Sequence, residues 1–175
     1  TTFNRLRKET LKGNPLQHNR IQAHEGIASY NSLNFYQRKV GRINYAAVQT
    51  RADIAKASSV LAEFLNNPSP HHYKEMDNII DYLYATRFMA IQFGDEPGQI
   101  HAYQGSEMPN QDLRITSDAA FADDQETRKS SQGSIIALFG GLISWKATKQ
   151  TTVTTSSTEA ELLAFSHTIK ETIAI

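Results

Sequence analysis

Apolar residues recur at helical spacing in the first half of the chain. One such set lies three or four positions apart: Ile54, Ala57, Leu61 and Leu65. This spacing puts the four side chains on one face of a helix. The pair Ser69-Pro70 predicts the start of a further helix, because serine is a good N-cap and proline suits the first helical residue. We therefore expect residues 30 to 86 to be helical, with an interruption at Gly41.

The pattern changes to that of β-strands near residue 113. In residues 113–121, Leu113 and Ile115 alternate with polar residues that include Asp118, and this is the period of a strand with one apolar face. Further on, two apolar runs flank Gly140-Gly141. A pair of glycines between such runs predicts a β-hairpin, because both positions of a tight turn need positive φ.

A last amphipathic pattern predicts a helix that begins near Ser156. Ser156 and Glu159 have the spacing of a capping box, in which each residue bonds the backbone of the other. The apolar positions that follow are Leu162, Phe165, Ile169 and Ile173. We expect this stripe to be buried against the sheet.

These elements predict an α+β fold, with a helical segment followed by three antiparallel strands and a helix. Residues 1–29 form a polar lead-in, residues 30–104 contain the helical part, and residues 112–175 contain the part rich in strands. A polar loop at 104–112 is the expected boundary between the two parts.

Charge and composition restrict the classes of function. The chain has 18 basic and 18 acidic residues, so there is no global basic field to attract nucleic acid and any such contact has to be local. Cysteine is absent, which excludes disulfides, thiolate metal sites and cysteine nucleophiles and suits an intracellular protein. No apolar run approaches the roughly 20 residues of a membrane span.

Two carboxylates have the layout of a divalent-metal site. Asp118 lies on a predicted strand, and Glu159 and Glu161 open the last predicted helix. The two glutamates lie about 160° apart around the helix, so only one can face the sheet. Glu159 has a capping role, which leaves Glu161 freer to bind a metal. Spacing alone favours the alternative that Asp118 is an exposed strand-end residue or a turn acceptor.

Four basic residues gather around the predicted strand ends: Arg128, Lys129, Lys146 and Lys149. Together with Trp145 they could contact a phosphate backbone. A solvated rim with Trp145 in the core explains the same residues.

Long ordered motifs of the chain resemble the ribonuclease H region of copia-type retrotransposon Pol polyproteins. Upstream, Thr50 to Ala55 and Phe64 to Pro68 resemble the end of the reverse transcriptase of that family, its thumb and connection. The resemblance covers residues from about 30 to 175. The runs that match the ribonuclease H region are Ser117-Asp118-Ala119, Thr127-Arg128-Lys129-Ser130, Ile143-Ser144-Trp145-Lys146, Lys149-Gln150 and Ser156-Ser157-Thr158-Glu159-Ala160-Glu161.

This resemblance implies an enzyme that hydrolyses the RNA strand of RNA–DNA hybrids with two Mg²⁺ ions. Asp118 and Glu161 correspond to the first and second metal-binding carboxylates of the family. Two further acidic residues complete that site, the next of them on a strand after the helix, whereas this sequence stops at Ile175. The polymerase aspartates would precede residue 1. We therefore expect the chain alone to be inactive and to bind Mg²⁺ weakly or not at all.

The resemblance also implies partners. Nucleic acid, above all an RNA–DNA hybrid, would bind weakly, and the remainder of the Pol polyprotein would be a protein partner. In the family's sheet the strand of Asp118 lies between the hairpin and the strand that follows the helix. Without that later strand, residues 113–119 would form an exposed sheet edge, and such an edge favours self-association.

The chain departs from the family pattern at several positions. Ala120 stands where the family has a second acid, and Phe121 stands where it has tryptophan. Asp81 and Tyr84 replace two basic residues of the thumb region. The alternative function is therefore a non-catalytic transposon relic that acts at most as a weak nucleic-acid-binding or protein-interaction module.

Overall fold

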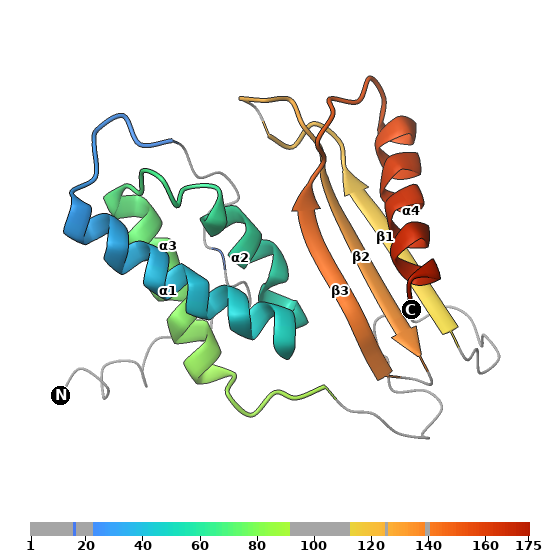
Figure 1. Cartoon of the computed structure of the whole chain (residues 1–175), viewed down its shortest axis with the longest axis horizontal. Coiled ribbons are helices and arrows are strands. Elements are labelled where there is room, and N and C mark those ends of the chain that lie inside the picture. Colours follow the sequence, from blue (N-terminus) through green and yellow to red (C-terminus); the bar gives the residue numbers. More distant parts are fainter. Residues whose placement is uncertain (1–15, 17–22, 92–112, 125, 139–140) are drawn as a thin grey trace. The chain divides into compact units, whose positions relative to one another are not determined.

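The computed structural model describes residues 16, 23–91, 113–124, 126–138 and 141–175. The chain forms two compact units, one up to Ala90 and the other from Ile91 onward. The first unit is helical, and the second combines a sheet with a helix (Figure 1). Most of the predicted lead-in at 1–29 and the whole predicted boundary loop at 104–112 lie outside the described residues. Within those residues, no helix is long and apolar enough to cross a membrane.

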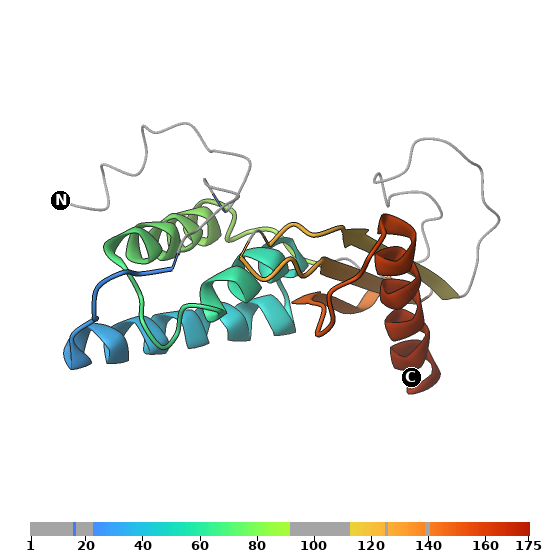
Figure 2. The same cartoon turned by 90° about the horizontal axis from the view of Figure 1, so that it is seen from above.

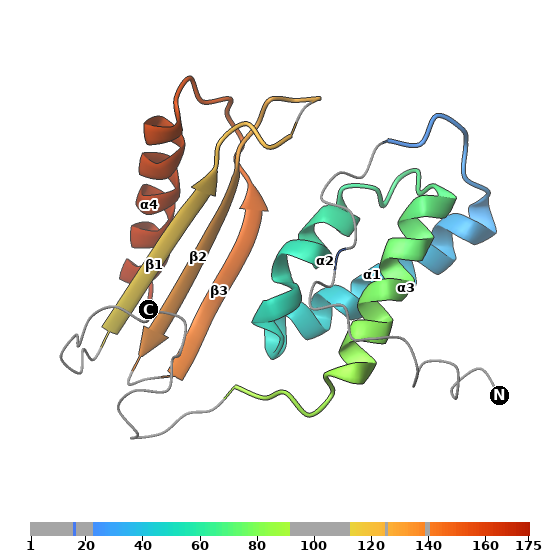
Figure 3. The ribbon, with the colours of Figure 1, turned by 180° about the vertical axis from the view of Figure 1, so that it is seen from behind.

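The first unit packs three α-helices around one core (Figure 3). Its elements are α1 (Tyr30–Gln49), the 3-10 turn η1 (Ala52–Ile54), α2 (Ala55–Ala62) and α3 (Pro70–Ala85). Helix α1 contacts both α2 and α3. The larger apolar side chains buried in this core are Tyr36, Val40, Ile43, Ile54, Leu61, Met76 and Ile79. The helical prediction for this region is confirmed.

Helix α1 runs without a break through Gly41, so the predicted interruption is wrong. A glycine costs a helix about 1 kcal/mol relative to alanine. Burial of Val40 and Ile43 on either side of Gly41 outweighs that cost. Tyr36 also ties α1 to α2, because its hydroxyl donates to the carbonyl oxygen of Leu61 at 3.0 Å, and burial raises the pKa of this hydroxyl.

Helix α3 starts as predicted, with Ser69 as N-cap and Pro70 at the first helical position. A histidine closes the capping box. The Ser69 hydroxyl accepts from the His72 amide at 3.4 Å, and His72 Nδ1 accepts from the Ser69 amide at 2.8 Å. His72 is fully buried and stacks on Phe64, with 4.0 Å between ring centroids. The His72 side chain therefore has a structural role in this unit.

Hydrogen bonds from Arg51 connect the segment after α1 to the end of α3. Its Nε and Nη2 donate to the two carboxylate oxygens of Asp53 at 2.9 and 2.7 Å. The same guanidinium donates to Thr86, the C-cap of α3, at 3.3 Å to the carbonyl and 2.5 Å to the hydroxyl. Burial raises the pKa of the Asp53 carboxyl, but hydrogen bonds from Arg51 and Tyr82 outweigh it and hold that pKa below its usual range.

The second unit is a three-stranded antiparallel sheet followed by one helix. The strands β1 (Leu113–Ala120), β2 (Ser131–Leu138) and β3 (Gly141–Lys149) lie in the order β1-β2-β3. Helix α4 (Ser157–Ile173) packs across β1 and β2, on one side of the sheet (Figure 2). The predicted α+β fold, with three antiparallel strands and then a helix, is confirmed.

The predicted hairpin is formed by β2 and β3. Leu138 pairs with Gly141, and a β-bulge shifts the register between Ile136 and Ala137. Strand β3 therefore starts at Gly141, one residue earlier than the sequence pattern predicts. On its other side β2 pairs with β1, so β2 is the central strand.

Helix α4 buries a different face from the predicted one. Ala160, Ala164 and Thr168 are at most 1% exposed, whereas Leu162 and Phe165 are 65% and 51% exposed. Small side chains spaced by four residues let the helix axis approach the sheet closely, and larger side chains there would hold it away. The predicted stripe thus lies on the outer side of α4, because steric fit to the sheet prevails over hydrophobicity.

The Arg51 contacts predict a local loss of stability on mutation. We expect Arg51→Gln to lower the free energy of opening of α3 amides by about 2–3 kcal/mol, because it removes the charged donor from the partly buried Asp53 carboxylate and from Thr86, the C-cap of α3. Native-state hydrogen exchange measures this quantity. Lys39→Gln is the control, since Lys39 forms an exposed ion pair with Asp77 that is worth less than about 1 kcal/mol. Equal effects of the two substitutions would contradict this role of Arg51.

Candidate nucleic-acid and metal-binding residues

Asp118 lies on the face of the sheet that α4 does not cover. Ser117, Ser134 and Lys146 are aligned across the three strands, and paired residues of neighbouring strands share a face. Lys146 forms an ion pair with Glu171 of α4, so this row of side chains faces the helix. Asp118 follows Ser117 in β1 and therefore points to the opposite face.

Glu161 lies exposed in the first turns of α4. Helix α4 starts beside the end of β1, so Glu161 and Asp118 lie at the same end of the unit (Figure 1). The sheet nevertheless separates the Asp118 side chain from the helix that carries Glu161. Within the described ranges, neither carboxylate has a hydrogen-bond or ion-pair partner, and no group of three or more potential ligands could hold a metal ion.

The acidic residues present do not form a complete Mg²⁺ site in the described part of the chain. Mg²⁺ needs near-octahedral oxygen ligation and loses its waters reluctantly. One carboxylate on each side of a sheet cannot supply that ligation to two ions.

The predicted capping box of Ser156 and Glu159 forms only in part. Ser156 is the N-cap of α4, and its hydroxyl accepts from the Glu159 amide at 3.1 Å. The Glu159 carboxylate accepts from the backbone and hydroxyl of Thr155 at 2.7 and 2.9 Å. These two bonds, the backbone one first, hold the pKa of the Glu159 carboxyl below its usual range. The Glu159 carboxylate thus accepts from Thr155, the residue before the N-cap. In a capping box it would accept from the backbone of the N-cap residue, Ser156.

Two aspartates absent from the predicted site organise the loop between β1 and β2. Asp123 accepts from the amide and hydroxyl of Ser131 at 2.7 and 2.6 Å. Asp124 accepts from the Thr127 hydroxyl at 2.5 Å and from Lys149 Nζ at 2.6 Å. The hydrogen bonds from Lys149 and Thr127 hold the pKa of the Asp124 carboxyl well below its usual range.

The four basic residues predicted to contact phosphate therefore differ in their surroundings. Lys146 and Lys149 both lie in ion pairs with acidic residues of the same unit. Arg128 is exposed and adopts a positive φ of 58°. Lys129 is half-buried, and its carbonyl oxygen accepts from the Asp124 amide at 3.2 Å. Of this set, Arg128 presents the charge most accessible to a ligand.

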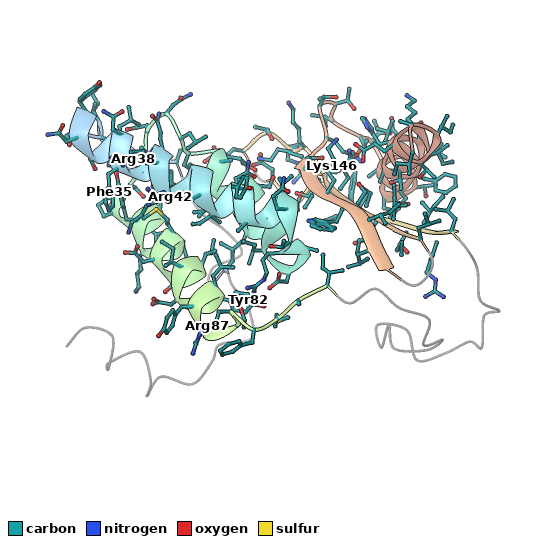
Figure 4. All side chains as sticks on the ribbon, turned by 60° about the horizontal axis from the view of Figure 1, so that its bottom comes forward. Phe35, Arg38, Arg42, Tyr82, Arg87 and Lys146 are labelled. Carbon is teal, nitrogen blue, oxygen red and sulfur yellow. The ribbon has the colours of Figure 1, made fainter. Side chains whose placement is uncertain are left out.

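A further pair of arginines, missed by the sequence analysis, lies on α1. Arg38 and Arg42 are one helical turn apart and exposed, on the side of α1 away from its buried face (Figure 4). Neither forms an ion pair with another described residue. Phe35 and Tyr45 lie beside them on the same face and are 51% and 71% exposed. We call these four residues the α1 face.

Several motif residues that carry the family resemblance are buried parts of the fold. Ser130 Oγ accepts from the Ala122 amide at 3.0 Å and lies 3.1 Å from Thr154 Oγ1. The Gln150 amide donates to the Ser130 carbonyl at 2.8 Å, and Gln150 Nε2 donates to the Ala160 carbonyl at 2.8 Å. These bonds join the β1–β2 loop, the end of β3 and the start of α4. Local sequence patterns cannot reveal them, because the partners lie far apart in the chain.

The Asp124 cluster predicts a specific pH dependence. A carboxyl whose folded-state pKa is depressed stabilises the fold above its ordinary pKa of 3.8, and this contribution is lost as the pH falls below that value. We expect Asp124→Asn to destabilise the second unit by about 1–2 kcal/mol near neutral pH. The difference from the unmodified chain should shrink as the pH falls from about 5 to about 2.

Denaturant titrations followed by the fluorescence of Trp145, the single tryptophan of the chain, measure this difference. Glu126→Gln is the matched control, because Glu126 lies in the same loop and is exposed. A difference between Asp124→Asn and the unmodified chain that stays constant with pH would contradict the assigned role of the carboxylate.

Comparison with known proteins supplies relatives. No protein-family model matches the chain. No solved structure matches it either. Over 138 residues the chain is 35% identical to the secreted RxLR effector protein 161 of Plasmopara viticola, which covers 79% of this chain and 89% of the effector.

Two further relatives are long polyproteins. The chain is 37% identical over 138 residues to the retrovirus-related Pol polyprotein from transposon TNT 1-94 of Nicotiana tabacum, and 33% identical to that from transposon RE1 of Arabidopsis thaliana. The match to the TNT 1-94 polyprotein covers 79% of this chain but only 9% of the polyprotein, and the match to the RE1 polyprotein covers 78% of this chain but only 8% of the polyprotein. The chain therefore belongs to the family of the secreted RxLR effector protein 161, which also includes segments of the retrovirus-related Pol polyproteins of copia-type transposons.

Proposed function

We propose that this chain is a module related to the reverse transcriptase and ribonuclease H region of a Pol polyprotein, and that by itself it binds nucleic acid weakly without cleaving it. The parent activity would be hydrolysis of the RNA strand of RNA–DNA hybrids by two-metal catalysis. The observation that supports the binding role most directly is the α1 face, with Arg38 and Arg42 exposed one turn apart.

The chemistry of the α1 face suits a phosphate backbone. Guanidinium groups bind phosphate oxygens in a bidentate manner. Tyr45 flanks the arginines and is 71% exposed, so an unpaired base could stack on it. The ring of Phe35 already contacts Tyr73 and lies beneath Lys39 Nζ. The other side of α1 carries the core of the unit, so a ligand could bind without disturbing the fold.

The charge distribution supports weak binding. The chain has no net charge, and Lys146 and Lys149 are already engaged by acidic residues. Each phosphate contact releases counterions and so adds to affinity. Arg38, Arg42 and Arg128 could neutralise only a few phosphates, and such binding falls steeply with salt.

The arrangement of the predicted metal ligands supports inactivity of the chain alone. In a longer protein Asp118 and Glu161 would each supply one carboxylate to the metal site. Here Asp118 points away from α4, and the described residues include no group of three or more side chains that could hold a metal ion. No catalytic step follows from this set.

A protein-interaction role is the second candidate. It is favoured by the exposed apolar side of α4, where Leu162, Phe165 and Ile173 are more than half exposed. The remainder of a Pol polyprotein would be one partner of that kind. An intracellular location stays a prediction.

The binding proposal predicts the effect of removing both α1 charges. We expect Arg38→Gln/Arg42→Gln to weaken binding to a fluorescently labelled RNA–DNA hybrid by about tenfold at low salt. The slope of log affinity against log salt should also fall by about 1–2, because each lost phosphate contact removes about 0.9 from it. Fluorescence anisotropy over a salt series measures both quantities.

The matched control is Lys74→Gln/Lys170→Gln, which removes two exposed positive charges carried by α3 and α4. If the two double variants lose the same affinity, the binding is a diffuse charge effect and the α1 face is not the site. Nanomolar affinity at physiological salt would also contradict the proposal of weak binding.

The inactivity proposal predicts no hybrid-specific cleavage. With Mg²⁺ present, the purified chain should leave the RNA strand of a labelled hybrid intact, because the described carboxylates do not converge on a common site. Gel analysis of the RNA strand over several hours measures this. Mg²⁺-dependent cleavage that Asp118→Asn abolishes would overturn the proposal and establish the chain as a nuclease.

A further inference from the structure

Among the described residues, strand β1 is an edge of the sheet, because it pairs with β2 and with no other described strand. One side of β1 therefore presents backbone N–H and C=O groups that another strand could pair with. Leu113 and Ile115, on the face towards α4, are 41% and 38% exposed, so apolar surface adjoins this edge.

The sequence of β1 is complementary to itself in the antiparallel direction. Arg114 and Asp118 lie on the same face of the strand, two positions on either side of Thr116. If two copies of β1 pair with Thr116 opposite Thr116, then Arg114 of each copy lies opposite Asp118 of the other. This single register forms two cross-strand ion pairs. Both side chains are exposed, and neither has an ion-pair partner among the described residues.

Helix α4 supports the same arrangement through its spacing. It packs across β1 and β2 and more extensively on β1, so its axis lies no more than about half a strand spacing inside β1. Strands are about 4.8 Å apart. Two copies joined at β1 would therefore bring their α4 axes to no more than about 10 Å from each other on the same face of the sheet, which is within the distance at which helices pack.

The flank of α4 that would meet its counterpart is apolar. His167 lines a pocket together with Lys146 and Thr148 of β3, so its side of α4 faces β3. Phe165 lies about 160° around the helix from His167 and so points to the side of the β1 edge. Phe165 is 51% exposed, with the half-buried Ile169 next to it. Contact between two copies would bury this otherwise solvated surface.

We propose that two copies of this chain associate through β1, antiparallel and centred on Thr116, to form a continuous six-stranded sheet with the two α4 helices side by side. The occupant of the edge is thus a second copy of this chain. Two independent features support it, namely the self-complementary charges of β1 and the helix spacing above it. The proposal does not depend on nucleic-acid binding.

Charge reversal and charge exchange test the register. Arg114→Asp and Asp118→Arg each place like charges opposite one another twice, so each should raise the dissociation constant of the dimer at least tenfold. The double variant Arg114→Asp/Asp118→Arg restores both pairs with reversed polarity and should restore the dimer. Sedimentation of the full chain over a range of concentrations measures these constants. Lys170→Asp, an exposed charge elsewhere on α4, should leave the constant unchanged.

Cross-linking gives a second, independent readout. The chain has no cysteine, so a single introduced thiol reports one position. Thr116→Cys should form a disulfide-linked dimer under mild oxidation, because only residue 116 lies opposite its own copy. Ala120→Cys should not, since its counterpart would lie beyond the other end of the paired strand.

Several results would overturn the proposal. They are a monomer at all concentrations, a dimer that is insensitive to both charge reversals, failure of the double variant to regain the affinity lost by the single ones, and equal cross-linking at positions 116 and 120. A monomer whose β1 amides are protected from hydrogen exchange would show that another segment of the same chain covers the edge.

Discussion

Buried hydrogen bonds of Gln150 hold three segments of the second unit together. Its backbone donates to Ser130 and its amide nitrogen donates to Ala160, so three segments that are distant in sequence meet at one residue. Gln150 is 4% exposed, and a buried polar group that lost its partners would destabilise the unit. The bonds of Gln150 thereby connect the first turn of α4, next to Glu161, to the end of β3 and to the segment before β2.

In the first unit Arg51 has the equivalent role, because it binds Asp53 and the end of α3. In both units, the residues that connect distant segments belong to the motifs of the family resemblance. A motif match at Arg51, Ser130 or Gln150 therefore carries information about the fold. It carries little about the chemistry of the chain.

The order and type of the elements could be predicted from sequence, because helical and strand periods, the Ser69-Pro70 start and the hairpin glycines are local signals. The buried face of α4 could not. Hydrophobicity favours Leu162 and Phe165, whereas the sheet accepts only the small side chains at Ala160 and Ala164. The continuity of α1 was likewise decided by burial on both sides of Gly41, which the glycine itself does not reveal.

For the candidate site, the sequence predicted which residue types are present but not how their side chains are arranged. Pairing of Lys149 with Asp124 depends on how the strands are aligned, and the sequence pattern does not fix that alignment. The face on which Asp118 lies could be read from the alternation of β1, but the face that α4 covers could not. The sequence pattern favoured the basic residues of the strand-rich part as phosphate contacts, so Arg38 and Arg42 were missed. Their four-residue spacing, opposite the apolar positions of α1, was a signal that could have identified them.

The division of α4 into a small-residue side and an apolar outer side has an evolutionary consequence. Substitutions at Ala160 or Ala164 have to remain small, since the sheet lies directly against them. Leu162, Phe165 and Ile173 are free of that restriction. A lineage could therefore remodel the outer surface of α4 for a new partner and keep the same fold, which would let one scaffold serve in proteins with unrelated roles.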